Sequence, residues 1–182
     1  NLPELEETIS AALLAGAEQI LLNRFLPGGR GLAHADALSL NRDELVTMLD
    51  TAEAVLETAG RFGSLGTEVP RCAVDAKKYS RLTVSTRCSA ALGFFVVGPS
   101  GYVRVCNHSE RRLVHISNVE ALKDDPYWKT FVFKEYLPAA CGGCAWDSDC
   151  DGGCREAAHI VHGDVASPDM LFDPVLKKEY VL

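Results

Sequence analysis

The chain has 182 residues, of which 47% are hydrophobic and 24% are charged, and its net charge is −7. This composition predicts one soluble globular domain, or one small domain with a further fragment. With 18 basic against 25 acidic residues and no basic stripe, nucleic acid is not expected as a partner. No apolar run approaches the roughly 20 residues of a membrane-spanning helix. No signal-peptide pattern follows Asn1, so we expect a cytoplasmic protein with no membrane partner.

The first sixty residues predict a helix, a strand and a second helix. Residues 3–16 should form an amphipathic helix, because apolar side chains recur on one face (Leu5, Ile9, Ala12 and Leu13). The apolar run at residues 19–25 (QILLNRF) predicts a strand of a parallel sheet, buried on both faces and ended by the sequence LPGGRG. A second helix is expected at residues 42–59, with Asn41 and Glu44 as a capping pair and an apolar stripe (Leu45, Met48, Leu49, Ala52 and Leu56). These elements make only part of an α/β fold, since a parallel strand needs a parallel neighbour.

The character of the sequence changes in the Gly- and Pro-rich segment at residues 60–70, where we place a boundary. Beyond it, GFFVV at residues 93–97 and YVRVC at residues 102–106 flank the turn sequence GPSG. Two apolar runs separated by a short glycine-containing turn predict a β-hairpin.

The last third of the chain predicts helices around a loop. Residues 119–137 should be helical in part, with an interruption at Pro126, and residues 141–154 should form a loop. A short helix is expected at residues 154–161. It would begin at Cys154, where the helix dipole favours a thiolate.

The chain has seven cysteines, and four of them stand within fourteen residues (Cys141, Cys144, Cys150 and Cys154). Glycine pairs at residues 142–143 and 152–153 free the backbone there to curl around a bound group. Cys88 and Cys106 flank the predicted hairpin, and Cys72 is the seventh. An odd number of cysteines with CxxC spacing fits metal ligation in a reducing compartment better than a disulfide framework.

The cysteine pattern reads Cys88, twelve residues, Gly101, four residues, Cys106, a gap, and then Cys-x2-Cys-x5-Cys-x3-Cys from Cys141 to Cys154. In these spacings, and in the flanking sequences RCSAALGFFVVGPSGYVRVCNHS and CGGCAWDSDCDGGCREAA, the chain resembles the SPASM domain. This domain is the C-terminal extension of many radical S-adenosylmethionine (SAM) enzymes. The first sixty residues, with LLNRFLPGGRG, resemble the last strand and helix of the radical SAM partial barrel.

The resemblance implies an α+β fold in two parts. Residues 1–62 would be the helix–strand–helix end of the radical SAM α/β partial barrel. Residues 63–182 would be a small SPASM domain with a β-hairpin, a helix and a cysteine-rich cluster loop.

The resemblance also implies two auxiliary 4Fe–4S clusters. By position, Cys88, Cys106 and Cys154 would bind the first, with Cys72 as the candidate for its fourth ligand. A buried thiol with no ligand role is the alternative for Cys72. Cys141, Cys144 and Cys150 would bind the second cluster.

The fourth ligand of the second cluster departs from the family pattern, which takes it from a cysteine beyond the cluster loop. No cysteine follows Cys154 in this sequence. Aspartate or histidine side chains are the candidates to replace it (Asp169, Asp173, His159 and His162). The alternatives are an incompletely ligated second cluster or none. Arg104 and Arg155 stand near ligands and would offset cluster charge, whereas Asp147, Asp149 and Asp151 are expected to be solvated.

Radical SAM chemistry requires a CxxxCxxC motif, and this sequence has none. The resemblance therefore implies the C-terminal part of an enzyme that modifies a peptide or protein substrate. S-adenosylmethionine and its own 4Fe–4S cluster would be bound by a radical SAM core, on the same polypeptide or a companion chain. A flavodoxin or ferredoxin reductant is a further implied partner. Alone, the chain should bind clusters and should not cleave S-adenosylmethionine.

Two rival interpretations come from other classes of protein. Four-cysteine zinc sites also use CxxC pairs, so the chain could be a zinc-stabilised recognition module without redox activity. It could also be a freestanding electron carrier of the ferredoxin type. The incomplete sheet expected in the first sixty residues argues against the second interpretation.

Overall fold

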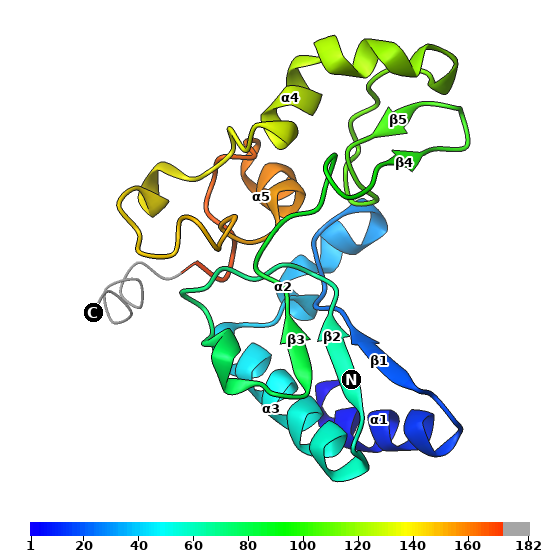
Figure 1. Ribbon diagram of the computed structural model, residues 1–182, viewed down its shortest axis with the longest axis vertical. Coiled ribbons are helices and arrows are strands. Elements are labelled where there is room, and N and C mark those ends of the chain that lie inside the picture. The colour runs from blue at the N-terminus through cyan, green and yellow to red at the C-terminus, as the bar shows by residue number, and fades with distance from the viewer. Residues whose placement is uncertain (173–182) are drawn as a thin grey trace.

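The computed structural model describes residues 1–172 and contains both helices and strands, so the mixed α and β character expected from the sequence is confirmed. A parallel sheet with its helices forms one region (Figure 1). A hairpin, short helices and the cysteine-rich loop form the other.

Two helices pack against each other beside the sheet. A short 3-10 turn, η1 (Leu2–Glu4), leads into α1 (Leu5–Leu14), and α3 spans Arg42–Ala59 as predicted. The expected capping box is present at the start of α3: Glu44 N–H donates to Asn41 Oδ1 (3.0 Å) and Asn41 N–H to Glu44 Oε2 (2.8 Å). All of the apolar stripe predicted for this helix is buried. Helix α3 forms where predicted because its cap and its apolar face are both local signals.

Three short parallel strands form the sheet in the order β1 (Gln19–Leu22), β2 (Phe62–Leu65), β3 (Leu82–Val84). Helices α1 and α3 cover one face of it (Figure 1). The expectation that the first strand is buried on both faces is wrong, because Leu21 is 64% exposed. The reason is that successive side chains of a strand point to opposite faces of the sheet, and only Ile20 and Leu22 of β1 pack against the core.

Residues 62 and 63, where the sequence places a domain boundary, both lie in β2. The core cluster under the sheet also joins the two sides of this point, since Leu49 and Leu56 of α3 pack with Leu65 and Leu82. The division into two domains stays a prediction, but β2 lies on both sides of its expected boundary.

The second region begins with the predicted hairpin, β4 (Val96–Val97) and β5 (Val103–Arg104), which is shorter than expected. The 3-10 helix η4 (Ile116–Asp124) ends just before α4 (Pro126–Val132), so Pro126 marks a boundary as predicted. The turn η5 (Ala139–Cys141) precedes the cysteine-rich loop, and α5 (Arg155–His162) has Cys154 as its N-cap. Shorter segments complete the described elements: η2 (Gly29–His34), α2 (Ala35–Leu38) and η3 (Ala76–Lys78).

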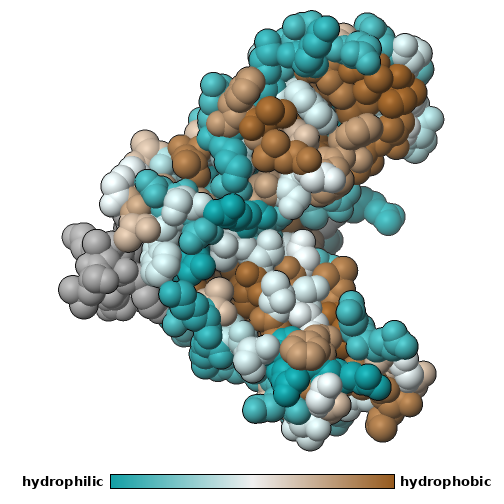
Figure 2. Space-filling model, in the orientation of Figure 1, coloured by the Kyte–Doolittle hydropathy of each residue, from teal (hydrophilic) through white to brown (hydrophobic). Residues whose placement is uncertain are grey.

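Apolar side chains are exposed over the hairpin region, as Figure 2 shows (Leu92, Phe94, Phe95 and Val97). No helix within residues 1–172 is long and apolar enough to cross a membrane.

Candidate functional site

A cavity of about 370 Å³ lies at the carboxyl edge of the parallel sheet. The segments that leave the strands form one side of it: Arg24 after β1, Glu68 after β2 and Ser85 after β3. Ligand sites in open α/β sheets gather at this edge. The other side carries thiol, carboxylate and imidazole groups (Cys88, Cys106, Cys154, Glu156 and His108).

The three cysteines of the cavity come from separate segments: Cys88 lies after β3, Cys106 after β5, and Cys154 at the start of α5. They are three of the four cysteines that the resemblance implied for the first cluster, Cys72 being the candidate fourth. Burial raises the pKa of all three thiols, to about 11 for Cys106 and about 12 for Cys154. The helix dipole was expected to favour a Cys154 thiolate, but desolvation outweighs it because the residue is only 5% exposed.

Backbone N–H groups face each of these sulfurs. The N–H of Ala90 favours the Cys88 thiolate, and that of Ala157 favours Cys154. Cys106 is favoured by the N–H groups of His108 and Ser109. Donors of this kind stabilise negative charge on sulfur and are a feature of iron–sulfur sites.

A buried ion pair connects the segment after β1 to a residue that lines the cavity. Asp169 Oδ2 accepts from Arg24 Nη2 at 2.6 Å and from Cys154 N–H at 2.8 Å. The same guanidinium donates to the Glu68 carbonyl oxygen from Nη2 (2.7 Å) and Nε (3.2 Å). Glu68 and Cys154 are therefore held relative to each other by one chain of hydrogen bonds.

Asp151 holds Cys88 in a similar way, since its Oδ2 accepts the Cys88 N–H at 2.8 Å. The expectation that Asp151 is solvated is wrong: it is 3% exposed and pairs with Lys134 Nζ at 2.8 Å. Asp149 is exposed and pairs with Arg87, and Asp147 is exposed. No sequence signal distinguished Asp151 from its neighbours, because its partners come from distant segments.

Gly152 and Gly153 allow the loop before α5 to turn, with φ of +74° and +89°. A Cβ at Gly153 would lie 2.5 Å from Asp169 Oδ2, so only glycine fits there. Arg155 is fully buried and donates to backbone carbonyls of this turn and of the segment after α5. Its role is therefore to hold the turn, rather than to face the cavity.

The second cysteine group lies in the loop around η5. Cys150 Sγ accepts the backbone N–H of Arg71 (3.4 Å) and of Gly152 (3.3 Å). The Arg71 guanidinium lies 4.6 Å above the Trp146 ring, and two buried donors, Arg71 Nε and Trp146 Nε1, have no hydrogen-bond partner among residues 1–172. Buried donors without a partner can serve an acceptor such as the sulfide of a cluster.

Cys72 is not among the residues that line the cavity of Cys88, Cys106 and Cys154. It is buried and directly follows Arg71, whose N–H contacts Cys150. The backbone thus brings Cys72 to the neighbourhood of the second group.

The structure gives each expected replacement ligand a different environment. Asp169 has both oxygens engaged, one by Arg24 and Cys154 N–H and the other by Leu171 N–H. The His159 ring packs against Tyr127 at 6.0 Å, and His162 is exposed at the end of α5. Asp173 lies outside the described residues.

Within residues 1–172, no three Cys, His, Asp or Glu side chains converge as ligands of a single metal ion do. A four-iron cluster imposes a different demand, because each iron takes its own thiolate and the ligands are spread around the cluster. Three thiols around one cavity fit that demand. Glu156 also lies in the cavity wall, where its Oε1 accepts from Tyr127 Oη (2.8 Å) and its carboxylate interacts with the Ser109 side chain.

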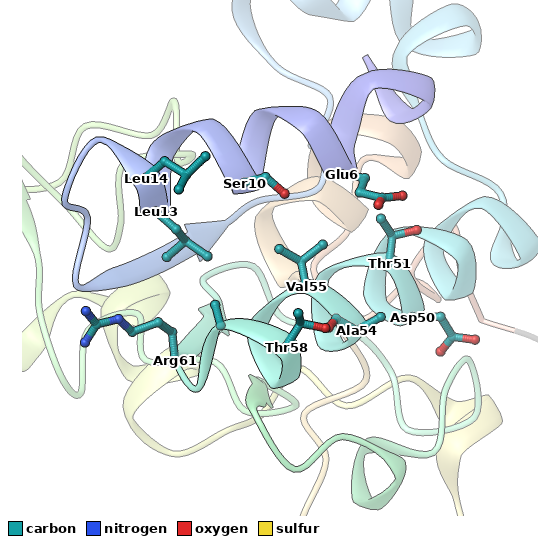
Figure 3. Close-up of a pocket in the computed structure, with 11 residues that line it drawn as sticks. Glu6, Ser10, Leu13, Leu14, Asp50, Thr51, Ala54, Val55, Thr58 and Arg61 are labelled. Carbon is teal, nitrogen blue, oxygen red and sulfur yellow. The ribbon is translucent and has the colours of Figure 1, made fainter.

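A separate hollow of about 770 Å³ lies between α1 and α3 (Figure 3). Helical side chains line it, including Ser10, Leu13 and Val55, and it has no cysteine or histidine in its wall. Its chemistry gives no reason to treat it as a site.

Comparison of the chain with protein-family models, with curated proteins and with solved structures gives no match. The functional argument therefore depends on the residues and their geometry.

Proposed function

We propose that this chain is the C-terminal portion of a radical SAM enzyme of the SPASM type and that it binds auxiliary iron–sulfur clusters. The observation that carries the proposal is the cavity lined by Cys88, Cys106 and Cys154, which lie far apart in sequence. Thiolates with backbone N–H donors are the usual ligands of such clusters. The first auxiliary cluster would occupy this cavity.

A cluster suits this cavity better than zinc does. A tetrahedral zinc site with Zn–S bonds of about 2.3 Å needs sulfurs about 3.8 Å apart, all facing one point. No such convergence of three ligands occurs among the described residues, although three thiols share the cavity wall. Thiolates that each bind a different iron need not converge in this way.

A second cluster would be bound by Cys141, Cys144 and Cys150. The unpaired donors Arg71 Nε and Trp146 Nε1 support an acceptor beside this group. We assign Cys72 to this cluster as the fourth ligand, in place of the cysteine that the family has farther along the chain. The contact of the preceding residue with Cys150 supports this assignment.

The position of the first cavity supports a role next to a radical SAM core. It opens at the carboxyl edge of the sheet, and β1 has no partner on its outer side within the described residues. In this proposal the core supplies S-adenosylmethionine and its catalytic 4Fe–4S cluster. The auxiliary clusters accept an electron or help to position a peptide or protein substrate, and a flavodoxin or ferredoxin serves as reductant.

Anaerobic iron and sulfide analysis of the chain, with electron paramagnetic resonance spectra of the reduced protein, tests this proposal. We expect about four irons and four sulfides for each cluster. Cys106→Ala and Cys154→Ala should each remove the first cluster, and Cys72→Ala should remove only the second. Zinc without sulfide in the wild-type chain would refute the proposal. If Cys72→Ala removes the first cluster instead, Cys72 is assigned to the wrong group.

A further inference from the structure

The two cluster sites are adjacent in the chain at Asp151. Cys150 belongs to the second site and Cys154 to the first, and Asp151 directly follows Cys150. The Asp151 side chain is buried, and its Oδ2 accepts the backbone N–H of Cys88, in the first site, at 2.8 Å. A carboxylate next to a thiol of the second site therefore holds the backbone of a thiol of the first.

The backbone on either side of this contact is also paired. Asp151 donates its N–H to the Thr86 carbonyl oxygen at 3.0 Å, and Thr86 Oγ1 donates to the Asp149 carbonyl oxygen at 2.8 Å. The segment that leads to Cys88 is thereby attached to the segment that carries Cys150. A displacement of one segment therefore displaces the other.

Among these links, the Asp151 carboxylate is the one that is buried and charged. Both of its oxygens accept from Lys134 Nζ, at 2.8 Å and 2.9 Å. Its bond to the Cys88 N–H is charge-assisted, and such bonds are roughly twice as strong as those between neutral groups. The neighbouring pair of Arg87 and Asp149 has side chains that are 56% and 55% exposed, so it contributes little.

Lys134 has a backbone conformation that supports a special role for its pair with Asp151. Its φ is +56°, in the left-handed region that residues other than glycine rarely adopt. Such strain persists only where the surrounding structure fixes the residue, and here the Lys134 side chain is fixed by both oxygens of Asp151. Because Lys134 offsets the charge of Asp151, a carboxylate can stay buried beside the Cys88 N–H.

The loop that carries the second site has to be confined before Asp151 has a fixed position. It contains glycine pairs at residues 142–143 and 152–153, and glycine loses more conformational entropy on ordering than any other residue. A cluster bound by this loop confines it, and Asp151 with it. The Cys88 N–H then meets a fixed acceptor, so the first cluster binds to a site whose ordering entropy has already been lost.

We propose that Asp151 is a positioning residue that couples the two cluster sites, so that a cluster in the second site prepares Cys88 to bind the first cluster. This inference rests on the proposed function. Without the second cluster, the first site still binds its own, but less tightly. Coupling of this kind is reciprocal, and between two binding sites it is typically about 5–150-fold.

The experiment uses the full chain with Cys106→Ala and Cys154→Ala, which can load only the second cluster and leaves Cys88 as a reporter instead of a ligand. Hydrogen exchange of the Cys88 N–H is followed by nuclear magnetic resonance of protein labelled at the cysteine nitrogens. It is measured without oxygen, before and after reconstitution with iron and sulfide. We expect loading of the second site to slow this exchange about tenfold.

Asp151→Ala in the same chain should abolish the difference between the loaded and unloaded states. A merely structural role of Asp151 would instead accelerate exchange equally in both states and leave their ratio unchanged. Asp149→Ala is the matched control, because its carboxylate lies in the same loop but is exposed, and it should keep the tenfold difference. Circular dichroism verifies folding, and the near-isosteric Asp151→Asn, which loses the ion pair with Lys134, serves if alanine is not tolerated.

Equal exchange in the loaded and unloaded parent would overturn the coupling. A tenfold difference that survives in both Asp151 variants, or that is also lost in Asp149→Ala, would overturn the assignment of Asp151. About four irons in the wild-type chain and none in the Cys106→Ala/Cys154→Ala chain would overturn this inference and leave the first cluster standing. A wild-type chain with no iron and no sulfide would refute the proposed function itself, so the two failures are distinguishable.

Discussion

The buried ion pair between Arg24 and Asp169 is expected to contribute strongly to stability. Its side chains are 2% and 1% exposed, and its N–O distance is 2.6 Å. Asp169→Asn preserves the shape of the side chain but leaves the guanidinium of Arg24 without its counter-charge in the interior. Breaking a buried pair in this way costs about 3–5 kcal/mol, whereas a solvent-exposed pair contributes about 0–1 kcal/mol. We expect Asp169→Asn to lower the free energy of unfolding by the former amount.

Urea unfolding of the reduced apo protein at 25 °C measures this difference. Asp43→Asn is the control, because Asp43 is 95% exposed and its nitrogen partner on Arg42 is 3.9 Å away. The double variant Arg24→Met/Asp169→Leu should recover part of the loss, since it removes both charges together. A loss below about 1 kcal/mol for Asp169→Asn, equal to that of the control, would refute the argument from buried charge.

Two further predictions concern the turn before α5 and the thiols. Gly153→Ala should lower the free energy of unfolding by about 1–3 kcal/mol through backbone strain, with a clash against Asp169 in addition. Gly143→Ala, where φ is +68° and nothing lies within 4 Å, should cost less, and equal losses in urea unfolding would contradict this reasoning. Burial raises the folded-state pKa of Cys106 to about 11 from an ordinary value of 9.0. The unfolded chain therefore loses this proton at lower pH than the folded protein does. As a result, the apo protein loses stability as the pH rises from 9 to 11. The free energy of unfolding should fall by roughly 2–3 kcal/mol over this range. Urea midpoints measured at pH 8 and at pH 10.5 should show a smaller decrease between the two pH values in Cys106→Ala than in the wild-type chain.

The parts of the fold that the sequence predicted are those with local signals. Helix α3 has a cap at Asn41 and an apolar stripe within eighteen residues. The hairpin turn depends on Gly101, whose φ is +78°. By contrast, β2 has the sequence FGSL, in which glycine and serine have low strand propensity, and its pairing with β1 spans some forty residues.

The candidate site, too, could be predicted from the sequence only in part. The resemblance to the SPASM domain implied that Cys88, Cys106 and Cys154 belong together, with Cys72 as the candidate fourth, and the first three line one cavity. The groups that hold them did not follow from spacing, because Asp151 and Asp169 act through the backbone N–H groups of Cys88 and Cys154. A carboxylate of this kind is recognisable only after the turn around it is known.

Glu68 could have been anticipated only through the sheet. The register pairs Leu22 with Leu65, so the segments that begin with Asn23 and Gly66 leave the sheet side by side. Arg24 and Glu68 then meet at the carboxyl edge, where Arg24 Nη2 lies 2.7 Å from the Glu68 carbonyl oxygen. A slip of β2 by one residue would turn its side chains to the opposite face and break this contact. The short, weakly β-forming strand β2 therefore determines whether Glu68 reaches the wall of the cavity of the three thiols.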